Sequence, residues 1–396
     1  MRIVALHTDF RLYWPARMKA LNTFLRKRGD CLEVIEIAGC GSPYAFATKE
    51  YTNELPWHIL FPKDRPEDLP GKTIRPLLFK LLDSLNPDII IAGAIAFPSG
   101  ALAVQWGQKQ SKRIIIFDDA KINAVPRSAL VNFIKKSVYH GIDAMFYPST
   151  EWKETGYFWG FNDKQMFFGI DVVDNNFWST PQQLENNWGD YFLAVGRQIP
   201  IKNFLSILKA YIKYLDNIGK KQAYKLILIG EGEEHHDIIT FVEEHQLQSN
   251  VILLPFQPQE KLPAIYQHAK AFCINSEEET WGLVINEAMA GGCPIFASSQ
   301  CGASETLIKH GVNGYTFDYT DVDRLASVMT EFTLLPEEKK QEMRNASRNI
   351  IKDWGLSRFV SGATEAIDFV KSRPKVTANF IERIIINQWN GRYRPI

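Results

Sequence analysis

Short apolar segments alternate with longer amphipathic segments along most of the 396-residue chain. In the first part, runs typical of buried strands alternate with runs that show helical periodicity. The strand patterns lie at 2–6, 32–37, 88–93, 113–117 and 144–149, and the helical patterns at 17–27, 73–85, 100–110 and 130–139. The region 39–71 is polar and rich in proline, and shows no assignable pattern. Strands separated by helices in this way predict a doubly wound parallel sheet.

The same alternation resumes near residue 190. Strand patterns lie at 191–196, 225–229, 251–256, 271–274 and 295–298, with a helical pattern at 203–215 and another that starts near 280. Gly291-Gly292 followed by Pro294 ends this last helix, as expected for a left-handed cap followed by a helix breaker. Because a domain usually has about 100–200 residues, the length predicts two domains. We expect them at residues 1–175 and 176–371.

The charges exclude one class of function and leave another open. The 45 basic and 45 acidic residues cancel, so no bulk field attracts nucleic acid. Residues 1–170 nevertheless hold 22 Lys/Arg against 17 Asp/Glu, and the helix at 130–139 carries Lys135 and Lys136. A basic first half suits an anionic acceptor or an anionic membrane face, and an ordinary solvated surface explains it equally well.

Cysteine content and hydropathy predict a location. The five cysteines form no Cys-x-x-Cys pair, and their odd number argues against a disulfide framework. No stretch reaches the ~18 consecutive apolar residues of a membrane span, and the first residues do not resemble a signal peptide. We therefore expect a cytoplasmic protein, with peripheral contact at the inner face of the membrane left open.

The segment 275–294 carries the candidate chemistry. Glu279 and Glu287 stand eight positions apart, on the order of 10 Å along a helix, which is too far for two carboxylates to share a proton. The spacing suits a long ligand held at two points, and a sugar nucleotide has this layout. A simple helix cap would explain one isolated glutamate. The backbone N–H groups of the helix N-terminus would favour an anion between the glutamates, at Thr280, Trp281, Gly282 and Leu283.

A second candidate lies at the start of the second domain. Gly196 ends a strand, and Arg197 and Lys202 bracket the loop that leads to the next helix, where they could present two cations to a diphosphate. Solvation alone would also explain such cations. A Gly-x-Gly turn begins at Gly230, but position 235 is His235 rather than glycine, so a dinucleotide fingerprint is not supported.

These two segments together resemble one enzyme family. Glu-Thr-Trp-Gly-Leu at 279–283, followed by Glu-Ala-Met-Ala-x-Gly-x-Pro at 287–294, resembles the Glu-x7-Glu signature of retaining glycosyltransferases of family 4. Val-Gly-Arg at 195–197, followed by Lys-Asn at 202–203, resembles that family's second signature. The resemblance implies the α/β fold called GT-B, in which two Rossmann-like doubly wound domains face each other across a cleft. It also implies that a C-terminal helix, at about 372–396, packs back on the first domain.

The resemblance further implies retaining, metal-independent transfer of a hexose without a cofactor. The donor would be a UDP-, GDP- or ADP-sugar, and the acceptor a hydroxyl of a carbohydrate or lipid-linked molecule in surface polysaccharide or glycolipid assembly. Glu279 would address the donor sugar and Glu287 the ribose, while Arg197 and Lys202 would neutralise the diphosphate. The remaining donor-binding residues implied are Gly196, Gly230, Thr280, Trp281, Gly282 and Leu283.

The first domain departs from the family pattern. Family members commonly carry His-Asp after the strand at 113–117, where this chain has Asp118-Asp119. We expect Asp118 to take that catalytic place, although a capping role is equally compatible and His7 is a substitute candidate. An ionised aspartate accepts a hydrogen bond but cannot donate one. Two alternatives remain open, namely a non-catalytic scaffold that keeps the nucleotide site and a sugar-nucleotide epimerase of the same fold.

Overall fold

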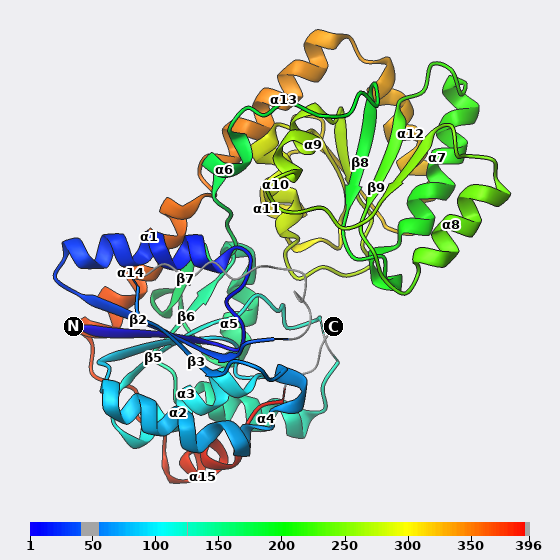
Figure 1. Ribbon diagram of the computed structural model, residues 1–396. Helices are drawn as coiled ribbons and strands as arrows, with labels where there is room; N and C mark the ends of the chain where they lie inside the picture. Colours follow the sequence, from blue (N-terminus) through cyan, green and yellow to red (C-terminus); the bar gives the residue numbers. More distant parts are fainter. Residues whose placement is uncertain (41–54, 125, 393–396) are drawn as a thin grey trace. The chain divides into compact units, whose positions relative to one another are not determined.

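The chain folds into two compact units. The computed structural model describes residues 1–40, 55–124 and 126–392 (Figure 1). Unit 1 consists of Met1–Val172 together with Leu356–Ile396, and unit 2 is Val173–Gly355. Among the described residues, no helix has both the length and the apolar character needed to cross a membrane. All five cysteines are free thiols.

Unit 1 is built on a parallel sheet with the strand order β3-β2-β1-β4-β5-β6-β7 in the described residues. The strands are β1 (Arg2–His7), β2 (Cys31–Ala38), β3 (Trp57–Phe61), β4 (Ile89–Ala92), β5 (Arg113–Phe117), β6 (Ala144–Tyr147) and β7 (Met166–Phe168). β3 and β7 were not recognised in the sequence pattern. β4, β5 and β6 are nearly fully buried, which explains why they read as continuous apolar runs rather than as alternating ones.

Helices cover both faces of this sheet (Figure 1). They are α1 (Trp14–Lys27), α2 (Gly71–Leu85), α3 (Pro98–Lys109), α4 (Ala129–Tyr139), α5 (Lys153–Trp159), α14 (Leu356–Ser372) and α15 (Phe380–Gln388), with 3₁₀ turns η1 (Pro66–Asp68), η2 (Thr150–Trp152) and η3 (Asp163–Gln165). The starts follow ordinary rules, since proline opens α1 and α3, and Ser128 caps α4 by accepting a hydrogen bond from the Val131 N–H.

The chain returns to unit 1 at α14, which the sequence analysis had placed in the second domain. α14 packs against α1, β6 and β7, and its buried face joins the same apolar core as β1 and β5. An amphipathic pattern shows that a helix has a buried face but does not show which core receives it. The last residues of the expected C-terminal helix, 393–396, lie outside the described residues.

Unit 2 repeats the architecture, with the order β10-β9-β8-β11-β12-β13. The strands are β8 (Tyr191–Val195), β9 (Lys225–Ile229), β10 (Val251–Leu254), β11 (Ala271–Ile274), β12 (Ile295–Ser298) and β13 (Gly314–Phe317). The helices are α6 (Asn175–Ser179), α7 (Phe204–Ile218), α8 (His235–Glu244), α9 (Leu262–His268), α10 (Leu283–Gly291), α11 (Gly302–Leu307), α12 (Val322–Leu334) and α13 (Glu337–Ile351), with the 3₁₀ turn η4 (Pro200–Lys202).

The two sheets confirm the expected α/β fold with two Rossmann-like units. In each sheet the strand order reverses beside the first strand, between β1 and β4 and between β8 and β11. Loops that follow two such strands diverge at the carboxyl edge of the sheet and leave room for a ligand. The fold therefore directs attention to the loops after β8 and β11, and to those after β1 and β4.

Gly362 in α14 provides a test of how this helix joins unit 1. A Cβ atom at this position would lie 2.2 Å from the carbonyl oxygen of Phe168 in β7. We expect Gly362→Ala to lower the free energy of unfolding by about 2 kcal/mol, because the overpacking outweighs the gain in helix propensity. Urea unfolding measures this. The exposed neighbour Ser361→Ala is the control, and its change should stay within about 0.5 kcal/mol. Equal stability of the two variants would contradict the packing.

Candidate functional site

The loops after β8 and β11 meet at the point where the strand order of unit 2 reverses. The N–H of Glu277, in the loop after β11, donates to the carbonyl of Ile201, in the loop after β8, at 2.9 Å. On its other side, the carbonyl of Glu279 accepts from the N–H of Gly302 at the start of α11, also at 2.9 Å. The loop after β11, which carries Glu277 and Glu279, is thus fixed from both sides by backbone hydrogen bonds.

An ion pair joins two of the residues that the sequence singled out. The Lys202 ammonium donates a hydrogen bond to Oε2 of Glu279, although the residues are 77 positions apart. Their side chains expose only 17% and 19% of their surface, so water screens the pair less than it would an open surface pair. Lys202 ends η4 and Glu279 precedes α10, so both side chains lie at the carboxyl edge of the sheet.

The helix begins later than the sequence pattern indicated. α10 starts at Leu283, and Gly282 is its N-cap residue, with a φ of 96° that L residues rarely adopt. Only from Leu283 onward are the N–H groups those of a helical first turn, which lack intrahelical acceptors. The expected N-terminus at Thr280 to Leu283 is therefore corrected, because Thr280 and Trp281 belong to the preceding loop.

Trp281 lies in the loop before α10, and its side chain is buried in unit 2. Its ring is 1% exposed, and its indole N–H donates to Oδ1 of Asn286 at 2.9 Å. The ring also packs against Trp354, with 5.5 Å between the ring centroids. The carbonyl of Trp281 accepts from the N–H of Ala303 at 2.9 Å. The indole side chain therefore anchors the loop and the start of α10 to the interior of unit 2.

Glu287 lies in the second turn of α10 and is only 3% exposed. Its Oε2 accepts a hydrogen bond from the hydroxyl of Tyr266, in α9, at 2.8 Å. A buried carboxylate requires such partners, because an uncompensated charge in the interior is costly. Tyr266 gives no sequence signal for this role, since it lies 21 positions away in another helix.

Two glycines let the loop after β8 and the loop after β9 approach each other closely. Gly230 has a φ of 141°, and a Cβ atom there would lie 1.9 Å from the carbonyl oxygen of Gly196. The N–H of Gly196 donates to Ile229 at 3.0 Å, and that of Gln198 to Glu231 at 2.9 Å. The half-buried Arg197 is held between these two contacts. The expected Gly-x-Gly turn therefore shapes the floor of the loop that carries Arg197.

Buried polar atoms near these loops were not anticipated from the sequence. Gln198 and Ser276 are fully buried, and among the described residues Nε2 of Gln198 and Oγ of Ser276 have no hydrogen-bond partner. The same holds for Oδ1 of Asn275, while its Nδ2 donates to the carbonyl of Tyr319 at 3.0 Å. Buried polar atoms usually have partners, so these positions mark where water or a ligand would be bound. Their only sequence signal is that they lie in the loops that follow β8 and β11.

Asp118 follows β5 in unit 1 and is partly buried. Burial, together with the neighbouring Asp119 charge, raises the pKa of Asp118 to about 6. Its carboxylate accepts from the Ala120 N–H at 3.0 Å and from the Tyr139 hydroxyl at 3.3 Å. The first contact is the turn cap that the sequence left open, and the second makes Asp118 part of a buried pair with Tyr139. Asp118 belongs to unit 1, whereas the other candidate residues belong to unit 2.

His7 ends β1, beside the strand-order reversal of unit 1. Its ring lies 5.0 Å from that of Phe117 and 5.5 Å from that of Trp14, measured between centroids. Burial lowers the pKa of His7 to about 4, so the imidazole is neutral at pH 7. Its Nδ1 has no hydrogen-bond partner in the part of the chain that the structure describes. A Cβ at Gly93 would lie 2.4 Å from this nitrogen, so glycine makes room for the ring.

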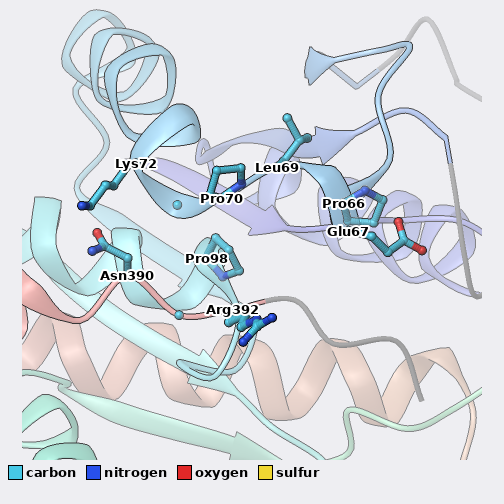
Figure 2. Close-up of a pocket in the computed structure, with 10 residues that line it drawn as sticks. Pro66, Glu67, Leu69, Pro70, Lys72, Pro98, Asn390 and Arg392 are labelled. Carbon is cyan, nitrogen blue, oxygen red and sulfur yellow. The ribbon is translucent and has the colours of Figure 1, made fainter.

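A separate hollow of about 850 Å³ lies in unit 1 (Figure 2). Three segments line it, namely the turn that leads into α2, the start of α3, and the chain just after α15. Its lining includes Leu69, three prolines and the basic residues Lys72 and Arg392. None of the residues predicted for the site lines it. In the described ranges, no three His, Cys, Asp or Glu side chains gather where they could hold a metal ion.

Comparisons with known proteins connect the second unit to one family. Residues 177–350 match the sequence model of the family described as "Glycosyl transferases group 1". The O-antigen chain mannosyltransferase B of Escherichia coli is 32% identical over 147 residues, which are 37% of each chain. Four of the curated relatives match this chain over 33% to 60% of their own length.

Solved structures extend the likeness to almost the whole chain. A glycosyltransferase from Rickettsia africae is similar with a TM-score of 0.74 and 14% identity, covering 94% of this chain and 99% of that one. Anabaena Alr3699/HepE, solved in complex with UDP, gives a TM-score of 0.71 and 14% identity, covering 93% and 100%. At such identities the likeness establishes the fold, which is that of GT-B glycosyltransferases.

The raised pKa of Asp118 predicts a pH dependence of stability. Between the unfolded value near 4 and the folded value of about 6, the native state binds more protons, so Asp118 destabilises the fold as the pH rises through this window. We expect Asp118→Asn to gain stability relative to the wild type between pH 4 and 7, by about 1–3 kcal/mol. Urea unfolding of the two proteins at several pH values measures this difference in stability. The lowered pKa of His7 has the opposite effect on the pH dependence, but it is present in both proteins and cancels in the difference.

The exposed Asp163 is a matched control for this experiment. Hydrogen bonds from Lys153 and Tyr157 lower the pKa of Asp163, so Asp163→Asn should lose rather than gain relative stability as the pH rises. A stability difference for Asp118→Asn that does not change with pH would contradict the buried, proton-binding state of that carboxyl.

Proposed function

We propose that the chain is a glycosyltransferase that moves a sugar from a nucleotide-diphosphate sugar to a hydroxyl acceptor. The observation that carries this proposal is the partly buried pair of Lys202 and Glu279 at the edge of the unit 2 sheet, directly before the N-terminus of α10. A cation, a carboxylate and the positive end of a helix are thereby brought to one place. Such a place suits a ligand with an anionic diphosphate and a sugar rich in hydroxyl groups.

The proposed chemistry depends on charge that develops on the leaving phosphate. When the bond from the sugar to the diphosphate breaks, negative charge grows on the phosphate oxygens. Arg197, Lys202 and the first turn of α10 would stabilise this charge without moving far, because backbone contacts fix both loops. In this proposal the diphosphate replaces Glu279 as the partner of Lys202, and Glu279 becomes available to the hydroxyl groups of the donor sugar.

Glu287 would bind the ribose of the donor. A carboxylate accepts hydrogen bonds from two neighbouring hydroxyl groups, and the Tyr266 hydroxyl keeps the Glu287 side chain in one orientation. The buried amide of Gln198 and the hydroxyl of Ser276 lie in the adjoining loops and would contribute further polar contacts to the donor. All of these groups belong to unit 2, which we propose as the donor unit.

The finer features of the proposal rest on the resemblance and on the names of relatives. The motifs at 279–294 and 195–203 support retention of configuration and a mechanism without a metal ion. An O-antigen mannosyltransferase and a lipopolysaccharide galactosyltransferase are among the similar proteins, which supports a hexose donor and an acceptor in surface polysaccharide or glycolipid assembly. UDP is the first nucleotide to test because Alr3699/HepE was solved with it, and GDP and ADP follow.

Nucleotide binding gives the first test. A nucleotide at about 100 times its dissociation constant should stabilise the protein by about 2.7 kcal/mol, without added metal. We expect UDP, GDP or ADP, alone or as a sugar conjugate, to raise the melting temperature in a thermal unfolding assay. Glu287→Gln should abolish the rise, whereas Glu338→Gln, an exposed glutamate of α13, should leave it unchanged. If no nucleotide shifts the melting temperature at millimolar concentration, the donor site is wrong.

Turnover tests the catalytic roles. We expect Lys202→Gln and Glu279→Gln each to lower kcat by about 100-fold or more, because each removes a group that acts on the transferring sugar or its leaving group. The control Lys213→Gln changes an exposed lysine of the neighbouring α7 and should retain wild-type kcat. Nuclear magnetic resonance of the product shows whether the anomeric configuration is retained.

The same assays separate the alternatives. An epimerised nucleotide sugar that forms without any acceptor would favour the epimerase, and nucleotide binding without turnover of any acceptor would favour the scaffold. Product of inverted configuration would contradict the retaining mechanism and leave the donor site intact.

A further inference from the structure

Exposed apolar side chains gather on two helices of unit 1. The described residues include twelve large hydrophobic side chains that are exposed, and six of them belong to α4 and α15. On α15 these are Phe380, Ile381 and Ile384, exposed to 79%, 64% and 51%, and on α4 they are Leu130, Val131 and Phe133. Soluble proteins rarely cluster such residues at their surface unless the surface binds something.

The tertiary structure brings these helices together although they lie about 250 positions apart. α4 and α15 are in direct contact within unit 1, and Nδ1 of His140, at the end of α4, lies 2.6 Å from Oε1 of Glu382 in α15. Both helices lie on the face of the sheet opposite to α1 and α14 (Figure 1). The exposed apolar residues of α15 thus lie on a helix that packs against the end of α4, and those of α4 lie in its first turns. We call the exposed sides of these two helices the α4–α15 face.

α15 is held firmly at both ends, so its exposed side is not the frayed end of a chain. Asn379 and Glu382 form a capping box at its start. Beyond its end, the indole N–H of Trp389 donates to the carbonyl of Ile95 at 2.7 Å, and the Arg392 N–H donates to Ala96 at 2.7 Å. Ile386 is buried on the inner side of the helix. One side of α15 therefore packs against unit 1, and the other side is exposed to solvent.

The chain segments that contain α4 and α15 hold more basic than acidic residues, although Lys375 is paired with Asp143, which follows the first segment. The sequence from 120 to 142, which contains α4, has four Lys/Arg and no Asp/Glu, and 371–392, which contains α15, has five Lys/Arg and one Asp/Glu. Unit 1 as a whole has 29 Lys/Arg against 21 Asp/Glu, and unit 2 has the opposite balance. Lys136 stacks over the ring of Phe158 at 4.3 Å from its centroid, beside the apolar residues of α4.

We propose that the α4–α15 face binds the surface of a lipid bilayer that carries anionic headgroups. Apolar side chains would enter the boundary between headgroups and acyl chains, while the basic side chains around them would contact the anionic lipids. A second copy of this chain fits less well, because a symmetric pairing would bring two faces of the same positive charge together. The proposal does not depend on the transferase activity, since its residues are not those of the donor site.

Vesicle binding tests the proposal with the full chain. The protein is sedimented with phosphatidylcholine vesicles that contain either no charged lipid or about 30% phosphatidylglycerol, a fraction that gives a strongly negative surface. We expect binding to the anionic vesicles only, weakened by high salt because the Debye length shortens. The triple variant Leu130→Ser, Phe133→Ser and Phe380→Ser should bind at least about tenfold more weakly, because it loses most of the inserted apolar surface.

Two controls keep the result specific. Val312→Ser with Leu334→Ser removes exposed apolar side chains from unit 2 and should bind the vesicles as the wild type does. Thermal unfolding with and without nucleotide checks that the triple variant is folded and that its donor site is unaffected. The proposal is overturned if anionic vesicles do not bind the wild type, or if the triple variant binds them equally well. It is also overturned if sedimentation velocity shows a dimer that the triple variant abolishes while vesicle binding is absent.

Discussion

The candidate site depends on the reversal of strand order between β8 and β11. Because these strands are neighbours and parallel, the loops that follow them leave the same edge of the sheet, and one carries Lys202 while the other carries Glu279. The resulting ion pair is partly buried, so removing either partner would leave a poorly solvated charge behind. In the proposed function, a diphosphate would take the place of Glu279 beside Lys202, and the hydroxyl groups of the donor sugar would hydrogen-bond to Glu279, so neither charge would be left without a partner. The pair therefore adds a side-chain link to the backbone hydrogen bond that already joins the two loops.

Conformationally restricted backbone surrounds this ion pair. Gly230 and Gly282 adopt conformations that other residues reach only with strain, and Gly230 lets two loops approach more closely than any side chain would allow. The side chain of Trp281 fixes the loop by packing on Trp354 and donating a hydrogen bond to Asn286. Groups that are fixed before a reaction stabilise developing charge without reorganising, which is the condition that the proposed transfer requires.

Unit 1 contains two ionisable side chains with shifted pKa values and two helices from the last part of the chain. At the carboxyl edge of its sheet, burial favours the protonated form of Asp118 and the neutral form of His7, so it shifts their pKa values in opposite directions. Burial is the main cause of both shifts, and the neighbouring Asp119 charge adds to that of Asp118. α14 and α15 come from the last part of the chain and complete this unit. α14 packs into the core, and α15 buries Ile386 while its other side exposes apolar residues.

The sequence alone determined the alternation of strands and helices, because the pattern of apolar residues that distinguishes them repeats over a few neighbouring positions. It also singled out Arg197, Lys202, Glu279 and Glu287 as candidates, because their motifs are short and continuous. It did not determine that Lys202 binds Glu279, that Tyr266 binds Glu287, or that α14 belongs to unit 1, since each joins segments far apart in the chain. Only the tertiary structure decided these contacts, because the order of strands in a sheet, and not the spacing of residues, sets which loops and helices meet.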